Sequence, residues 1–369
     1  MHSVTTTTTC VPNFMAVIFS GTETIEKAWF YNWLQVFFGT GLLNSGGNKW
    51  RSRRRFLNGC FRKDILKEHV PIINEKSRIL VESLKKETSE DFTIISKPIS
   101  ECMTNTLNEI LFGPHKAENQ CELRDFIYAL KWGMRFIAER IMNIFLWPDF
   151  IYFSTKRGRE LKKHAKAVKD FTRSRIQQRK QKHLQRDFSA REAKGRPLLD
   201  LLLEYHLERT DFTENDLSDE LITFMTAGQD STTVAISWTL YMLGLYQDIQ
   251  AKVHEELDLI FCEDPERHVT LEALNKMKYL KSVIKETLRL YPPAPFLARQ
   301  VHEDVNICAI TRKIAQKLRL QQTDDRYVAL NARRPTERTN GELSRNLTVA
   351  TGAVIYKQIV SRRVAEKGL

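Results

Sequence analysis

The 369-residue sequence is poor in residues that mark several protein classes. Its six cysteines are too few for a disulfide scaffold, and no two have the C-x-x-C spacing of zinc ribbons or thioredoxin-type motifs. Fifteen glycines and eleven prolines exclude collagen-like and low-complexity chains. The most apolar window, 136–153, contains Glu139, Arg140 and Asp149, so no transmembrane helix is expected. The Thr-rich start lacks the basic and apolar regions of a signal peptide.

Apolar residues are plentiful, and positive charge is unevenly spread. Hydrophobic residues make up 42% of the chain, with 20 Phe and 6 Trp, enough for a sizeable core. The net charge is +12, and two segments hold the excess: 156–196 has 16 Lys/Arg against 4 Asp/Glu, and 309–369 has 13 against 5. The pattern indicates local basic surfaces or tails rather than a general affinity for nucleic acid.

Apolar residues recur with a period near 3.6, and strict alternation is rare, which predicts a mainly α fold with little β. Pro71 is expected to interrupt the first of the predicted helices, and Thr213 is expected to cap the long central one. The predicted helices cover 65–86, 123–145, 158–186, 213–244, 248–261 and 279–290. After residue 308 aromatic residues become rare, which indicates a poorly ordered basic tail.

Three local features stand out. The stretch AGQDSTT, from Ala227, places glycine and small polar residues inside the long helix, where they weaken helical structure. Such a turn is typical of a functional site, and a polar patch on an exposed face is the alternative. Glu286 and Arg289 are spaced to pair on one helical face. A basic run begins at Trp50.

In their order along the chain, these segments resemble the cytochrome P-450 superfamily, specifically its family-4 branch. Arg299, ten residues after Arg289, belongs to the same pattern. The resemblance covers a core at 16–308, and leaves an N-terminal extension at 1–15 and the tail at 309–369 unmatched. The supporting stretches are GTGLL from Gly39, KWRSRRR from Lys49, WPDFIY from Trp147, AGQDSTT from Ala227, ISW from Ile236, and KETLRLYPP from Lys285.

The resemblance implies a haem held between two long helices, with a cysteine thiolate as the axial ligand of its iron. Trp50 and Arg54 would lie beside one haem propionate, and Arg299 would be a second propionate partner. Glu286 and Arg289 would form a structural ion pair near the face of the haem that carries the thiolate.

The polar turn of the long helix would pass over the haem, with Ala227, Gly228 and Thr232 in contact with it. The resemblance assigns proton relay to Asp230 and Ser231, an acid–alcohol pair in which Ser replaces the usual Thr. Ala227 replaces a glutamate that often esterifies the haem in family 4, so no covalent link is expected there.

Ala294 and Phe296 match a strand that lines the substrate pocket, and a simple core position is the alternative for Phe296. The implied activity is monooxygenation of apolar, lipid-like substrates, with electrons from an NADPH-dependent flavin reductase. Arg51, Arg53 and Arg55 would belong to the face that meets this acidic partner. Solvent exposure without a partner is the alternative for these three arginines.

The most specific family motif, Phe-x-x-Gly-x-Arg-x-Cys-x-Gly, does not fit the sequence. None of the six cysteines has Phe, Gly and Arg at the required spacing: Cys10, Cys60, Cys102, Cys121, Cys262 and Cys308. We therefore expect an incomplete P-450 core without a metal ligand and without activity of its own. A truncated remnant that binds partners and a basic nucleic-acid binder are the alternatives, although nucleic acid is not an expected partner.

The resemblance and the sequence itself also lead to different expectations for localisation. Family members lie on the endoplasmic reticulum membrane through an N-terminal anchor, which the sequence does not show. A cytoplasmic or peripheral protein is expected instead, with membrane contact through the region 145–153.

Overall fold

The computed structural model describes residues 26–87, 93–114, 120–184, 196–261, 267–295 and 297–300. These ranges are almost wholly helical, and their only β feature is an isolated antiparallel bridge between Lys27 and Arg299, so the mainly α prediction is confirmed. In chain order the elements are η1 (Trp29–Leu34), α2 (Gln35–Phe38), α3 (Gly47–Cys60), α4 (Lys63–Glu87), α5 (Ser96–Phe112), α6 (Gln120–Met142), η3 (Ile144–Leu146), α7 (Asp149–Ser154), α8 (Lys156–Leu184), α9 (Leu198–Glu208), α10 (Glu214–Leu245), α11 (Gln247–Phe261), α12 (Leu271–Lys276) and α13 (Lys278–Leu290).

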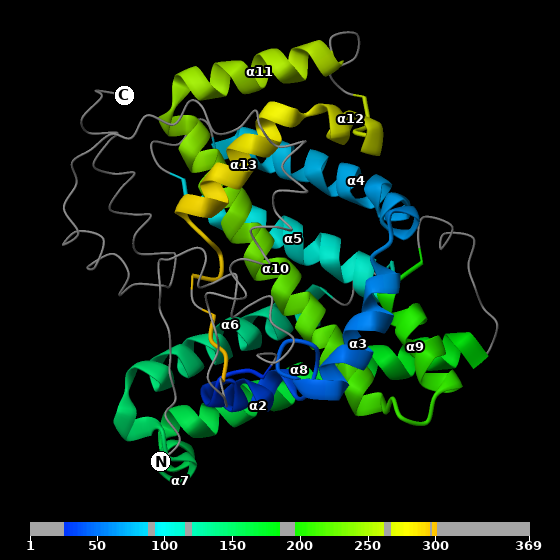
Figure 1. Ribbon diagram of the computed structural model, residues 1–369, viewed down its shortest axis with the longest axis vertical. Helices are drawn as coiled ribbons and strands as arrows, with labels where there is room; N and C mark the ends of the chain where they lie inside the picture. Colours follow the sequence, from blue (N-terminus) through cyan, green and yellow to red (C-terminus); the bar gives the residue numbers. More distant parts are fainter. Residues whose placement is uncertain are drawn as a thin grey trace, which may run out of the picture.

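Helix α10 crosses the middle of the structure, with α5 beside it and α13 near its C-terminal end (Figure 1). Its start is fixed by a capping box, as the sequence indicates. The Thr213 hydroxyl oxygen accepts a hydrogen bond from the Asp216 N–H at 3.2 Å, and the Asp216 carboxylate accepts one from the Thr213 N–H at 3.0 Å. From this start α10 runs for 32 residues, or about 48 Å at 1.5 Å per residue.

The polar turn does not break α10, because its hydroxyl groups bond back to the helix. The Thr226 hydroxyl donates to the carbonyl of Ile222 at 2.8 Å, and the Ser231 hydroxyl donates to the carbonyl of Ala227 at 2.6 Å. Such bonds satisfy the side chains without opening the backbone ladder. Helix α10 therefore remains regular through the turn that contains these small polar residues.

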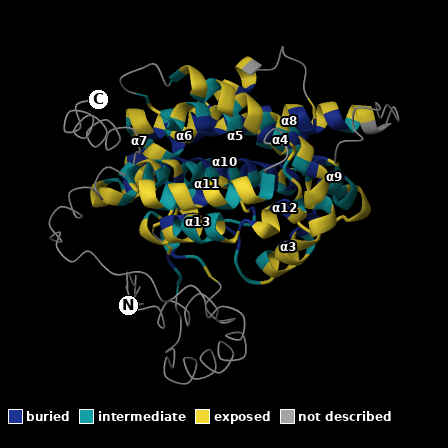
Figure 2. Ribbon diagram, turned by 90° about the horizontal axis from the view of Figure 1, so that it is seen from above, coloured by how far each residue is buried: buried dark blue, intermediate teal, exposed yellow. Residues whose placement is uncertain are grey.

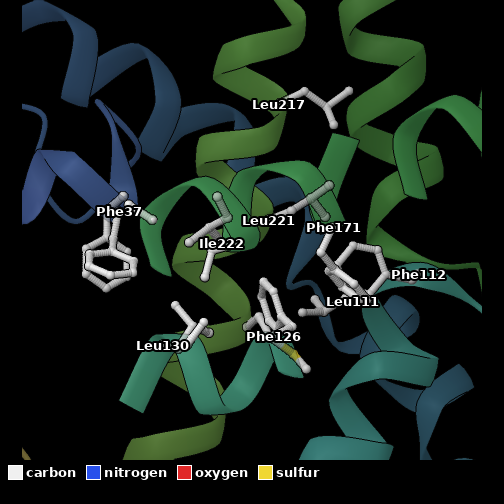
Figure 3. Packing of buried hydrophobic residues seen from close by; sticks show 14 of the residues in the cluster. Phe37, Leu111, Phe112, Phe126, Leu130, Phe171, Leu217, Leu221 and Ile222 are labelled. Atoms are coloured by element: carbon white, nitrogen blue, oxygen red, sulfur yellow. The ribbon is translucent and has the colours of Figure 1, made fainter. Parts of the chain in front are cut away.

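The main core lies where α2, α5, α6, α8 and α10 meet (Figure 3). Phe37, Phe126, Phe171 and Leu221 are all buried there, and the Phe126 and Phe171 rings are 4.5 Å apart. Figure 2 shows α10 between the layer of α5, α6 and α8 and the layer of α11 and α13. One side of α10 is thus fixed by a large apolar core.

The predicted helices are present, with two differences. Helix α4 continues through Pro71, so the expected interruption there is wrong. Helix α6 ends at Met142 rather than near residue 145, because the Asn143 side chain accepts a hydrogen bond from the Phe145 N–H and starts a 3₁₀ turn. Helix α5 was not predicted, since its apolar face is interrupted by buried polar residues such as Thr104 and Asn108. None of the helices in the described ranges has the length and apolar character needed to cross a bilayer.

Arg140 joins α6 to the turn that follows it. Its guanidinium, 1% exposed, donates to the carbonyls of Leu146 at 2.9 Å and Trp147 at 2.7 Å, and to the Asp149 carboxylate. The same group lies 4.3 Å from the centre of the Trp33 ring. A single buried cation therefore holds η1, α6, η3 and α7 together.

We expect Arg140→Met to lower the free energy of unfolding by roughly 1–3 kcal/mol, because two carbonyls and a carboxylate lose their buried donor. Urea denaturation followed by circular dichroism measures the change. Arg62→Met is the control, since Arg62 pairs with Asp64 on the surface, where an ion pair contributes about 0–1 kcal/mol. Equal losses in the two variants would contradict the assigned role of Arg140.

Candidate functional site

The junction of α3 with α10 is made by buried charge. Arg53, 6% exposed, pairs with Asp216 at 3.0 Å and lies 4.0 Å from the centre of the Phe212 ring, while Lys49 pairs with Asp216 at 2.8 Å. Although burial opposes it, hydrogen bonds from Lys49 and Thr213 and the charge of Arg53 hold the pKa of Asp216 far below its usual range. The prediction that Arg53 lies on a partner-binding surface is therefore wrong.

A second group of positive charges lies beside Trp50 of α3, where residues from the two ends of the described chain meet. The backbones of Lys27 and Arg299 form the antiparallel bridge, and the Lys27 ammonium is 6.0 Å from the centre of the Trp50 ring. Burial, followed by repulsion from Arg299, lowers the pKa of Lys27 to about 8. Burial also lowers the pKa of Arg299, with Tyr31 opposing the shift. Lys27, Trp50 and Arg299 are called the cation cluster below.

Within the cation cluster, Lys27 is the neighbour of both other residues: its backbone pairs with that of Arg299, and its ammonium faces the Trp50 ring. Both cations are half-buried, and Lys27 forms no ion pair within the described part of the chain. A bound carboxylate would relieve the repulsion between them and accept charge-assisted hydrogen bonds. Arg54, one helical turn after Trp50, is exposed and makes no hydrogen bond or ion pair with the described residues.

Lys27 was missed by the sequence analysis. No motif marks it, and its place beside Arg299 depends on a backbone bridge between residues far apart in the chain. The stacked rings of Trp238 and Tyr291, 4.1 Å apart, fix the segment that leads from α13 to this bridge. Figure 1 shows that segment running from α13 towards α2.

The polar turn of α10 presents Ala227 and Ser231 on an exposed face. Asp230, half-buried beside them, has its pKa raised by burial, and Lys131 of α6 opposes the shift. A carboxyl group of this kind retains its proton to a higher pH than an exposed aspartic acid does. Thr232 is half-buried in the same turn.

The opposite face of this turn packs on α5. A Cβ atom on Gly228 would lie 3.1 Å from both terminal carbons of Leu107, so the glycine permits close helix packing. Buried Gln229 donates to the Ser100 hydroxyl oxygen at 2.8 Å, and Lys131 donates to the same oxygen at 2.8 Å. This link between α5, α6 and α10 was also missed, since no local pattern signals it.

The remaining predicted residues lie apart from these groups. Glu286 and Arg289 form a two-bonded ion pair, at 2.8 and 2.6 Å, on the surface of α13, and the hydrogen bonds from Arg289 lower the pKa of Glu286. Ala294 is exposed, and Phe296 lies outside the described residues.

The thiols of the described residues are not arranged as metal ligands. Burial raises the pKa of Cys60 to about 11, Cys102 donates to the carbonyl of Lys76 at 3.4 Å, and exposed Cys121 accepts from Arg124. In the described ranges no group of three His, Cys, Asp or Glu residues could hold a metal ion. Cys10, Cys262 and Cys308 lie outside those ranges.

Comparison with known proteins identifies the family of the chain. The family model for cytochrome P450 matches residues 8–311. Cytochrome P450 4V2 of Homo sapiens is 35% identical over 300 residues, which are 79% of this chain and 57% of that protein. Cytochrome P450 4c21 of Blattella germanica is 31% identical over 307 residues, covering 81% and 61% respectively. The chain thus spans about three fifths of the length of these curated relatives. It belongs to the cytochrome P450 family and is similar to its family 4.

Proposed function

We propose that the chain forms the distal wall and the carboxylate-binding edge of a haem site, in a protein whose activity is monooxygenation. The observation that carries the proposal is the cation cluster, in which two half-buried cations are neighbours and one of them, Lys27, lies over an indole ring. Such a group fits the two carboxylates of a haem. Helix α10 supplies the other part of the fit, an exposed Ala227–Ser231 face with a half-buried acid beside it.

In this proposal each residue has a limited role. Trp50, Arg299, Lys27 and Arg54 bind the carboxylates and orient the ring by its edge. When bound, haem supplies the iron chemistry that inserts one atom of dioxygen into an apolar C–H bond. Gly228 keeps α10 close to α5, and Thr232 lies on the same turn.

Asp230 and Ser231 hold the proton that the reaction needs. The raised pKa of Asp230 favours its protonated form, and the Ser231 oxygen keeps free lone pairs because its hydrogen is donated to Ala227. Since Ala227 carries no carboxylate, the site makes no ester link to the porphyrin.

The partners follow from the same proposal. The substrate is apolar and lipid-like, with Ala294 and Phe296 on its side of the site. Electrons come from an NADPH-dependent flavin reductase, and exposed Arg51 and Arg55 of α3 contribute to the surface that meets this acidic protein. Glu286 and Arg289 act as a structural pair.

Lys27→Met tests the cation cluster without any iron chemistry. We expect it to weaken the binding of metal-free protoporphyrin IX about tenfold, the loss of one charge-assisted hydrogen bond. Quenching of tryptophan fluorescence measures the affinity. Binding an anion raises the pKa of Lys27 from about 8, so wild-type affinity falls as the pH rises through 8, and the fall disappears in the variant.

The controls are a second lysine and a second ligand. Lys63→Met removes an exposed lysine of α4 and leaves the affinity unchanged. Protoporphyrin dimethyl ester, which lacks the two charges, binds weakly to both proteins. If the ester binds as tightly as the diacid, the cluster does not recognise carboxylates.

The chain as it stands is expected to be inactive, because none of its cysteines has the spacing of the family's axial ligand. Haem-loaded protein, reduced and exposed to carbon monoxide, is therefore expected to lack the thiolate-type Soret shift. Appearance of that shift would show that a cysteine of this chain reaches the iron. Failure to bind haem would favour the alternative of a non-catalytic, partner-binding chain.

A separate surface fits peripheral contact with a membrane. Four large apolar side chains project from the turn between α6 and α8: Met142, Ile144, Phe145 and Phe150, which are 80%, 63%, 78% and 76% exposed. The start of α8, directly after them, is strongly basic. Apolar tips beside positive charge suit an anionic lipid surface. We propose that the region 145–153 touches the bilayer in this way.

Changing Phe145 and Phe150 together to Ser is expected to abolish most binding to vesicles that contain anionic lipid, measured by flotation. The control changes Leu207 and Leu259, which are 61% and 82% exposed on other helices, to Ser and keeps the binding. Equal binding by both double variants would exclude this surface as the site of contact.

A further inference from the structure

The turn that precedes α3 is fastened to α10 by two carboxylates. The Thr40 N–H donates to the Asp219 carboxylate at 2.8 Å, and the Leu42 N–H donates to the Glu220 carboxylate at 3.0 Å. Both acids project from the first two turns of α10. These two backbone N–H groups therefore donate to side-chain carboxylates of a neighbouring helix rather than to backbone carbonyls.

The glycines of this turn make the approach possible. Gly39 has φ +49°, and a Cβ atom there would lie 2.0 Å from the Asp219 carboxylate. A Cβ atom on Gly41 would lie 2.7 Å from the Thr223 hydroxyl oxygen. Any larger residue at either position would push the turn away from α10.

A third carboxylate of α10, Asp216, reaches the start of α3 through Lys49. Lys49 donates to the Thr40 hydroxyl oxygen at 2.6 Å and to Asp216 at 2.8 Å, so one side chain joins the turn, α3 and α10. Trp50 is the next residue along α3. Its position beside Lys27 therefore depends on how the turn sits on α10.

Glu220 is the most buried of these acids, 1% exposed. Burial raises its pKa to about 7; the Leu42 N–H and Arg53 oppose the shift, and the charges of Asp219 and Asp216 add to it. Burial also raises the pKa of Asp219. The Thr40 N–H, Lys169 of α8 and Lys49 of α3 oppose that shift, and Asp216 adds to it.

We propose that Asp219 and Glu220 are positioning residues that hold the turn at 39–42 on α10, set the place of Trp50, and release the turn when Glu220 loses its proton. The two hydrogen bonds that hold the turn on α10, from the Thr40 N–H to Asp219 and from the Leu42 N–H to Glu220, are together called the latch below. It is a property of the chain by itself, and only its consequence for haem rests on the proposed function.

The direction follows from proton linkage. A released Glu220 in water has the ordinary pKa of 4.5, whereas in the latch its pKa is about 7. The latched form therefore binds a proton more tightly, and raising the pH from below 4.5 to above 7 favours release by up to a few hundredfold. The contribution of the latch to stability is complete at low pH and is lost as the pH rises through 7.

Hydrogen exchange of the Thr40 and Leu42 amides measures latch opening directly in the full chain. After correction for the chemical exchange rate, we expect opening at Leu42 to increase at least tenfold between pH 5.5 and pH 8. In Glu220→Gln, which keeps an acceptor oxygen but cannot ionise, opening at Leu42 is expected to depend much less on pH than in wild type. The Leu130 amide, in the buried part of α6, reports any change in global unfolding.

Two further variants complete the test. Glu220→Met removes the acceptor, and Leu42 is expected to exchange rapidly at every pH, while Glu208→Gln, at an exposed position at the end of α9, is expected to behave as wild type. If Glu220→Met fails to fold, the comparison of wild type with Glu220→Gln still decides. An equal pH dependence in those two proteins would overturn the proposal, as would rapid exchange of Leu42 in wild type at pH 5.5.

Binding of protoporphyrin IX separates this inference from the proposed function. If the diacid binds and its affinity falls between pH 6 and pH 7.5 in wild type but not in Glu220→Gln, the latch positions the cation cluster. Affinity that is equal in the two proteins across this range overturns the positioning role. If no porphyrin binds at all while the exchange results hold, the proposed function fails and the latch stands.

Discussion

The contact between α3 and the start of α10 is the constraint on which the candidate site depends. Buried Arg53 pairs with Asp216, and Lys49 joins Asp216 to the preceding turn. A buried pair of this kind is costly to break, because the surviving charge is left without a partner or water. It therefore fixes which way α3 faces, and with it the direction in which Trp50 projects.

The two groups of charge are opposite in kind. At the α3–α10 junction each cation has an acid, and the pKa of Asp216 is held low as a result. In the cation cluster two positive groups are neighbours, and burial and repulsion lower the pKa of Lys27. The first arrangement stabilises the fold by itself. In the second, a bound anion would relieve the repulsion on Lys27, and this is the basis of the proposed carboxylate site.

The sequence showed those features whose causes are local. The Thr213 cap, the long helix after it and the Glu286–Arg289 pair follow from spacing along one helix, and each is present. The difference between Arg53 and Arg54 is not local, since one is buried only because α10 lies across that face of α3. Lys27 was invisible for the same reason: its significance arises from a bridge to a segment at the far end of the described chain.

Helix α10 connects both halves of the site, yet its first turns and its middle are held by different contacts. Near Asp230 it is held by close packing, with Gly228 against Leu107 and Gln229 bonded to Ser100. Neither contact involves a titrating group. Near Glu220 it holds the turn and α3 through carboxylates. On this proposal, loss of a proton at Glu220 loosens the turn at 39–42 and leaves the proton-holding turn in place, because α5 anchors that part of α10 independently. The edge of the site can thus move while its distal wall stays fixed.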